Sequence, residues 1–96
     1  MATQVIQTPA TKSDTQKKHH PGYRVLLHND DYNTMEYVVQ VLMEVVGLSE
    51  PQAVSVMMEA HTNGIALVTV CALEHAEFYC EGLRRKGLTS TIEPAE

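Results

Sequence analysis

The spacing of apolar residues predicts a strand and then a helix in the first part of the chain. Over residues 23–28 one face would carry Tyr23, Val25 and Leu27 and the other Arg24, Leu26 and His28, and a period of two is typical of a half-buried strand. From Thr34 to Val46 apolar residues recur every three or four positions, which predicts a helix with one buried face. Gly47 is expected to end this helix, because glycine readily adopts the left-handed backbone conformation found there.

A second helix is expected to begin at Ser49 and to stop at Asn63-Gly64. Ser49 and Gln52 have the spacing of a capping box, in which each side chain bonds to the backbone of the other residue. Pro51 is tolerated here, because the N–H group of a residue in the first turn has no partner within the helix.

The rest of the chain predicts a strand, a helix and a final strand. Residues 65–71 are apolar and partly β-branched, which favours a buried strand. A third helix is expected over residues 73–86, with Gly87 ending it, and a last strand over residues 88–93. The order β-α-α-β-α-β predicts a two-layer α+β domain, in which a three-stranded antiparallel sheet packs against three helices.

Residues 1–22 have no apolar period and are rich in Thr, Gln, Lys, His and Pro. Such a segment cannot bury enough apolar surface to offset the entropy lost on ordering. Because the 96 residues are enough for one small domain only, we expect a flexible N-terminal tail over residues 1–22 and a single core domain over residues 23–96.

Composition then excludes several classes of function. The net charge of −5 disfavours nonspecific binding to nucleic acid or to an anionic membrane, since both require clustered cations. No apolar run is long enough to span a bilayer, and no secretory signal is visible. The two cysteines, Cys71 and Cys80, form no CxxC pair and are expected to be free thiols. We therefore expect a cytoplasmic protein with no nucleic-acid or membrane partner.

The turn between the first strand and the first helix carries more polar side chains than helix capping needs. Asn33 is expected to be the N-cap, with Glu36 completing a pair that resembles a capping box. Asn29, Asp30 and Asp31 are then left without a structural duty, which indicates that this turn holds a ligand.

Metal binding and catalysis are both poor explanations of this turn. A calcium loop that starts at Asn29 would need Gly and Glu where Thr34 and Gln40 stand. The paired carboxylates and His61 could act in acid–base chemistry, but no recognisable motif places a nucleophile beside a base. We therefore expect no enzyme activity, no metal and no cofactor.

A recognition site is the remaining possibility. If the first two helices pack side by side, Met35, Val38 and Met57 would form an apolar floor next to His61 and the polar turn. Such a site fits an ammonium group beside an apolar side chain, which is the chemistry of a free peptide N-terminus. By spacing alone, Met35, Val38 and Met57 are more often core residues, and His61 could simply bond the last carbonyls of its helix.

Two segments of the chain resemble the motifs of the ClpS family. They are YRVLLHNDDYNTMEYVV at residues 23–39 and MMEAHTNG at residues 57–64, in the order found in that family. The resemblance covers about residues 23–93. It implies a small adaptor that delivers substrates to an AAA+ Clp unfoldase–protease, and that recognises proteins by a destabilising N-terminal residue, usually large and apolar or aromatic (the N-degron of the N-end rule).

The resemblance also implies a role for each matching residue. The α-amino group of the substrate would be bound by Asn29, Asp30, Asp31 and His61. Its first side chain would enter a hydrophobic pocket lined by Leu27, Asn33, Met35, Val38, Met57, Ala60 and Leu88, with Met35 as the gate. The unfoldase N-terminal domain, of ClpC or ClpA type, would dock near Glu74 and Tyr79.

Some positions depart from the family pattern. Ala60 stands where Val is common, so the pocket could be wider on that side, and Tyr79 stands where some members carry Lys. The third helix and residues 58–61 look most like cyanobacterial members, which implies a ClpC-type partner. The alternative is a non-catalytic assembly module of ribosomal stalk-like fold that docks a partner protein, in which the polar turn would serve only as a cap.

Overall fold

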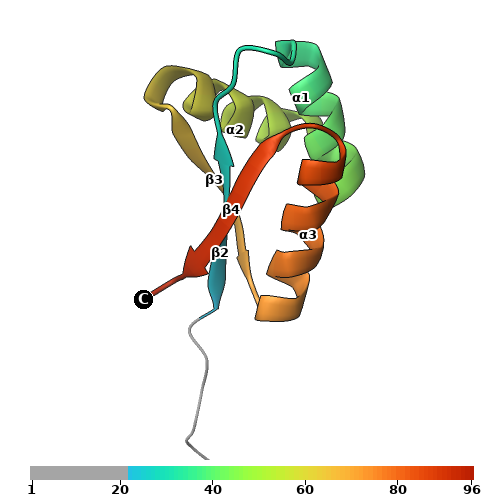
Figure 1. Cartoon of the computed structure of the whole chain (residues 1–96). Coiled ribbons are helices and arrows are strands. Elements are labelled where there is room, and N and C mark those ends of the chain that lie inside the picture. Colours follow the sequence, from blue (N-terminus) through green and yellow to red (C-terminus); the bar gives the residue numbers. More distant parts are fainter. Residues whose placement is uncertain (1–21) are drawn as a thin grey trace, which may run out of the picture.

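The computed structural model describes residues 22–96, and the predicted N-terminal tail lies outside this range apart from Gly22. The elements follow the predicted order (Figure 1). They are β2 (Tyr23–His28), α1 (Met35–Val41), the π-helical turn η1 (Leu42–Val46), α2 (Glu50–Asn63), β3 (Ile65–Cys71), α3 (Leu73–Arg85) and β4 (Thr89–Pro94).

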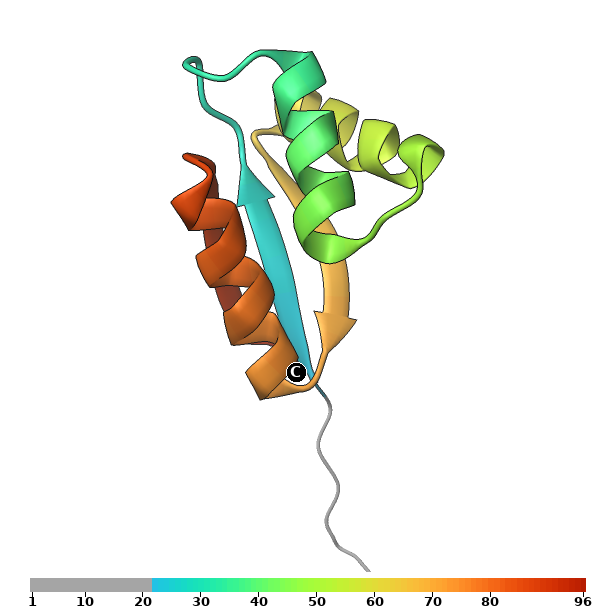
Figure 2. The ribbon, with the colours of Figure 1, turned by 90° about the vertical axis from the view of Figure 1, so that its right-hand side faces the viewer.

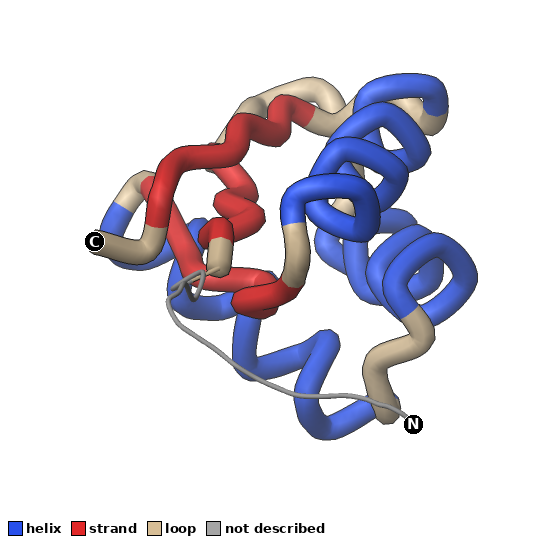
Figure 3. Tube along the Cα trace, turned by 90° about the horizontal axis from the view of Figure 1, so that it is seen from below, coloured by secondary structure: helices blue, strands red, loops and turns tan. Residues whose placement is uncertain are grey.

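The sheet has the strand order β3-β2-β4, and the central strand β2 is antiparallel to both neighbours. Figure 2 views the molecule from the helical side, with α1 and α3 in front of the strands. Figure 3 shows the strands lying together, with the helices packed beside them. The predicted two-layer α+β architecture, three helices against a three-stranded antiparallel sheet, is confirmed.

The hydrophobic core lies between the sheet and the helices. Val25 and Leu27 of β2 point into it, as the period of two predicted, and Leu42 of η1 and Leu83 of α3 are fully buried. No helix of residues 22–96 covers the other side of the sheet. Val70 of β3, for example, is 48% exposed.

Strand β3 is therefore buried on one face only, so the expectation of a buried strand holds for that face and not for the other. Ala66 and Val68 are buried, while Ile65 and Leu67 are exposed. The physical reason is that β3 is an edge strand and that helices cover only one face of the sheet. Between Val25 and the next residue of β2 the register shifts, which leaves Val68 as an extra residue in β3.

The start of α1 differs from the prediction. The N-cap is Thr34, not Asn33, because the hydroxyl of Thr34 accepts a hydrogen bond from the backbone N–H of Tyr37 at 3.1 Å. The predicted pair of Asn33 and Glu36 is absent. The helix ends as expected at Gly47, which has a left-handed φ of 83°.

The other predicted boundaries agree closely with the structure. Ser49 and Gln52 form the predicted capping box, with bonds of 3.3 and 3.0 Å. Helix α3 ends one residue before the predicted position, and β4 is shifted by one residue toward the C-terminus. The last turn of the first helix is wound as π, with hydrogen bonds between residues five apart, and the apolar spacing did not predict this.

Candidate functional site

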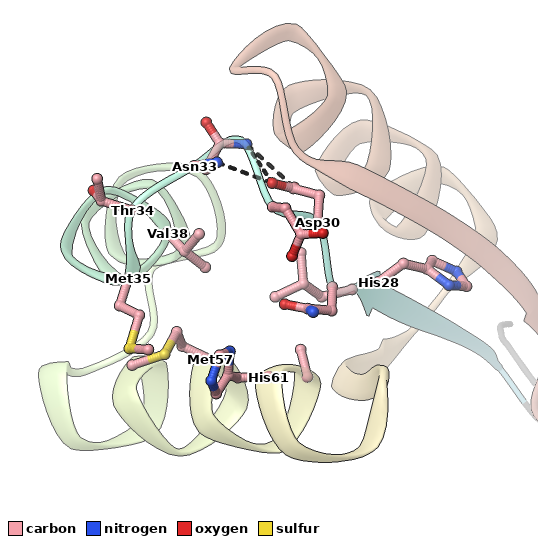
Figure 4. A pocket seen from close by; sticks show the side chains of 12 residues that line it. His28, Asp30, Asn33, Thr34, Met35, Val38, Met57 and His61 are labelled. Atoms are coloured by element: carbon pink, nitrogen blue, oxygen red, sulfur yellow. Dashed lines mark hydrogen bonds between the residues drawn. The ribbon is translucent and has the colours of Figure 1, made fainter.

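Three elements meet at one end of the sheet and form a cavity there (Figure 4). They are the turn that follows β2, the start of α1 and the second half of α2. The backbone N–H of Asn29 donates to the carbonyl of Gly64 at 3.0 Å, which joins the end of β2 to the turn after α2. Gly64 has a left-handed φ of 87° that ends α2. This connection brings His61, in the last turn of α2, to the polar turn.

We call this cavity the pocket. It has a volume of about 310 Å³. Its apolar wall is formed by Met35 and Val38 of α1, Met57 and Ala60 of α2, and Leu27 of β2. In Figure 4 the Met35 and Met57 side chains approach each other across the gap between the two helices. A volume of this size suits a single small ligand or one large side chain.

Ten of the eleven residues predicted for amine binding or for the hydrophobic pocket line this cavity. They are Leu27, Asn29, Asp30, Asp31, Asn33, Met35, Val38, Met57, Ala60 and His61. They come from two segments of the chain, residues 27–38 and 57–61, and the fold brings these segments together.

Leu88 does not line the cavity, so the prediction for this residue is not met. It is only 4% exposed and belongs to the core cluster. Gly87, with a φ of 91°, turns the chain after α3, and the next apolar side chain is buried between the helices and the sheet rather than at the site.

The carboxylate of Asp30 is bound within its own turn. Its Oδ1 accepts hydrogen bonds from the backbone N–H groups of Tyr32 and Asn33, both at 3.0 Å. The side-chain amide of Asn33 lies 3.2 Å from each carboxylate oxygen. Partial burial alone would raise the pKa of Asp30, but these hydrogen bonds outweigh it and hold the pKa below its usual value. The expectation that Asp30 has no structural duty is therefore wrong.

Two hydrogen bonds attach the start of α1 to the turn between α3 and β4. The amide of Asn33 donates to the carbonyl of Gly87 at 3.0 Å, and the Tyr37 hydroxyl donates to the carbonyl of Lys86 at 2.7 Å. Asn33 thus serves to brace the loop rather than to cap the helix. Because the loop is held at both ends, the polar edge of the pocket has a defined position relative to its apolar wall.

Asn29, Asp31 and His61 form the exposed polar edge of the pocket. Within residues 22–96 no protein group makes a hydrogen bond to any of these three side chains. An amide oxygen, a carboxylate and an imidazole can all accept hydrogen bonds from an ammonium group. These three side chains are therefore available to a ligand, in contrast to Asp30.

Two further residues, His28 and Thr34, also line the cavity. Neither was predicted from the sequence as a site residue. The imidazole of His28 points away from the other labelled side chains in Figure 4, and its Nε2 lies 2.8 Å from the hydroxyl of Thr91. Thr34 is occupied as the N-cap of α1. The preference for Thr at N-caps was the available signal for Thr34, and the neighbouring Asn33 obscured it.

The predicted docking residues lie on α3, away from the pocket. Glu74 is exposed near the start of this helix, whereas Tyr79 is half-buried and packs against the core. Among the residues that the structure describes, no group of three or more His, Cys, Asp or Glu side chains could hold a metal ion. No helix in that same part of the chain is both long and apolar enough to cross a membrane.

Comparison with known proteins gives a consistent result. Residues 18–91 match the model of the ClpS family, described as ATP-dependent Clp protease adaptor protein ClpS. A ClpS adapter protein of Synechococcus elongatus is 61% identical over 95 residues, which cover 98% of each chain. The chloroplastic CLPS1 adapter of Chlamydomonas reinhardtii is 53% identical over 97% of this chain and 58% of its own length.

A solved structure is also similar, that of Agrobacterium tumefaciens ClpS2 bound to L-phenylalaninamide. It is 40% identical in sequence, with a TM-score of 0.70 over 78% of this chain and 99% of that chain. With the family match over residues 18–91, these similarities show that the chain belongs to the ClpS family of ATP-dependent Clp protease adaptors.

Proposed function

We propose that this protein binds the free N-terminus of substrate proteins that begin with a large hydrophobic residue, and delivers them to a Clp unfoldase–protease. The α-amino group is held by Asn29, Asp31 and His61 at the polar edge of the pocket. The first side chain enters the apolar part, where Met35 gates the entrance. Asp30 acts mainly by shaping the turn.

One observation carries this proposal: a single cavity joins an apolar wall to three exposed polar groups without a partner among residues 22–96. The ligand bound to the Agrobacterium relative has the same two parts. L-Phenylalaninamide carries a free amine and a benzyl side chain, and its amide stands where the next peptide bond of a protein would begin. It therefore has the chemistry of an N-terminal phenylalanine.

The same geometry explains how a chain end is distinguished from a chain interior. A protonated amine makes charge-assisted hydrogen bonds to Asp31, and these are about twice as strong as neutral ones. An internal peptide group lacks that charge and leaves the carboxylate unpaired. A first residue that branches at Cβ would contact Met35 and Val38, and we expect it to be rejected for that reason.

The family name supports a Clp protease as the partner and a binding role without catalysis, and it favours an adaptor over an assembly module. We propose that the partner is a ClpC-type unfoldase, because relatives at 61% and 53% identity are cyanobacterial and chloroplastic. Its N-terminal domain would dock on α3 around Glu74, with Tyr79 contributing from a half-buried position. A cytoplasmic location stays a prediction.

A peptide series that varies only the first residue tests the proposed function. Fluorescence anisotropy should show tight binding for Phe, Tyr, Trp and Leu, and binding weaker by about tenfold or more for Val, Ile and Ser. Because Ala60 leaves room on one side, Trp is expected to bind at least as well as Leu. Affinities that do not depend on the first residue would contradict the proposal.

A further inference from the structure

A second apolar groove, of about 670 Å³, lies between α1 and α2 beside the pocket. Its floor is formed by Val39 of α1, Met43 of η1 and Val54 of α2, and Met35 and Met57 close one end. We call it the α1–α2 groove. Met35 and Met57 also line the pocket, so the two cavities adjoin at these two side chains.

The groove keeps apolar side chains in contact with water. Met43 is 38% exposed and Val54 is 39% exposed, although both lie within helices. Apolar side chains gathered in a hollow are a common feature of binding surfaces. Covering them with a ligand would therefore release water and favour binding.

The rim of the groove is acidic. Glu36 of α1, Glu44 of η1 and Glu50 of α2 line it, and no Lys or Arg of residues 22–96 stands among its lining residues. Glu44 accepts a hydrogen bond from Gln40 at 3.0 Å, which leaves its charge uncompensated. Such a rim favours an occupant that has a basic side chain close to an apolar one.

The length of the groove matches a short run of extended chain. Met35 and Met43 are eight residues apart, which corresponds to about 12 Å along a helix. An extended peptide covers this distance in three to four residues, at about 3.3 Å each. A chain whose first residue fills the pocket could therefore lay its third to fifth residues in the groove.

From this continuity, and on the basis of the proposed function, we infer that the α1–α2 groove is a second subsite for the same substrate. It takes an apolar side chain at about the third position and a basic one at about the fifth. In an extended chain these two positions point to the same side as the first. The groove would then select among substrates that share the same N-terminal residue.

Three labelled peptides test this inference on the full chain by fluorescence anisotropy. They begin Phe-Ser-Leu-Ser-Lys, Phe-Ser-Ser-Ser-Ser and Phe-Ser-Leu-Ser-Glu, with identical tails. The first should bind about three- to tenfold more tightly than the second, since one apolar side chain and one rim charge each contribute modestly. The third peptide should bind more weakly than the first, because its Glu is not attracted by the acidic rim. The ratio of the affinities for the Lys and Glu peptides should shrink at high salt.

Matched variants locate the effect. Glu50→Gln should reduce the preference for Lys over Glu, whereas Glu77→Gln, the same charge change on exposed α3, should leave it intact. Val54→Ser should reduce the preference for Leu at the third position. Val70→Ser, at an exposed site on the face of the sheet opposite α1 and α3, should not reduce this preference.

The outcomes separate the two proposals. Phe peptides that bind only with a free amine, but with equal affinity whatever their third and fifth residues, would overturn the second subsite and leave the proposed function standing. No binding of any Phe peptide would overturn both. Methyl NMR signals of Val54 that shift with protein concentration would assign the groove to a second copy, and signals that shift when residues 1–20 are removed would assign it to the chain's own N-terminus. Either result would overturn the inference.

Discussion

Asp30 and Asp31 are neighbours in the chain, but they have different surroundings. Asp30 is half-buried and accepts hydrogen bonds from Tyr32 and Asn33, whereas Asp31 is exposed at the polar edge of the pocket. One carboxylate therefore stabilises the turn and the other is available to a ligand. The sequence could identify both as unusual, but composition alone could not divide these roles, because the division depends on where the turn folds back.

Replacing Asp31 should weaken binding without affecting the fold. Asp31→Ala is expected to lower the affinity for a Phe-initiated peptide by about tenfold or more, because a charge-assisted hydrogen bond contributes about 1.5–3 kcal/mol. The melting temperature should change by no more than about four degrees, since the side chain is exposed and such substitutions change stability by about 0.5 kcal/mol or less. Anisotropy and thermal melting measure the two effects.

His61→Ala should behave in the same way, and Glu77→Ala on α3 provides the control for a lost exposed charge. If either pocket variant melts at a much lower temperature, the residue has a structural duty and the assignment to amine binding loses its support.

Asp30 should instead affect stability, and it should do so in a defined pH range. Its pKa is lowered in the folded protein from an ordinary value of 3.8. The stability that its ionised form contributes is therefore fully present above pH 3.8 and is lost as the pH falls through the lower folded value. Asp30→Asn should be less stable than the parent at pH 7, and the difference should shrink below pH 3.8. Chemical denaturation at both pH values would measure this. If the free energies of unfolding of the parent and of Asp30→Asn differ by the same amount at both pH values, the account is contradicted.

At the scale of elements, the loop before α1 is determined by competition between two possible caps. Asn33 and Thr34 are both good N-cap residues, and Glu36 has the spacing that favours Asn33. The structure selects Thr34, because the amide of Asn33 is engaged by Asp30 and by the carbonyl of Gly87. That carbonyl is 54 residues away in the chain, so local sequence carried no information about it.

Close packing of η1 against α3 gives a prediction at this scale. A Cβ atom added at Gly82 would lie 2.7 Å from Cγ1 of Val45. Alanine normally stabilises a helix relative to glycine by about 1 kcal/mol, but Gly82→Ala should lower the melting temperature, because the branched Val45 side chain has little rotamer freedom.

The double variant Gly82→Ala with Val45→Ala removes the methyl group that is contacted. Adding Gly82→Ala to the Val45→Ala chain should therefore lower the melting temperature less than adding Gly82→Ala to the parent chain. If Gly82→Ala proves stabilising in the parent chain, the helices are not in close contact at this point.

At the scale of the whole molecule, the predicted order of strands and helices and the two-layer architecture were correct. The apolar periodicity of each segment is a local property, and the apolar faces that it predicted are the ones that pack in the core. The lining of the pocket was largely predictable through the family motifs, which place His61 next to Asn29 although 32 positions separate them in the sequence. Leu88 was assigned to the wrong surroundings. Burial in a core and burial in a pocket give the same apolar signal, and only the three-dimensional structure distinguishes them.

The central claim is that the pocket recognises a free chain end. The most direct test compares two peptides that are identical from an initial phenylalanine onward, one with a free α-amino group and one with that group acetylated. We predict that the free peptide binds and that acetylation weakens binding by at least about tenfold, because the charge that pairs with Asp31 is lost. Equal affinities of the two peptides for the full chain would contradict the account.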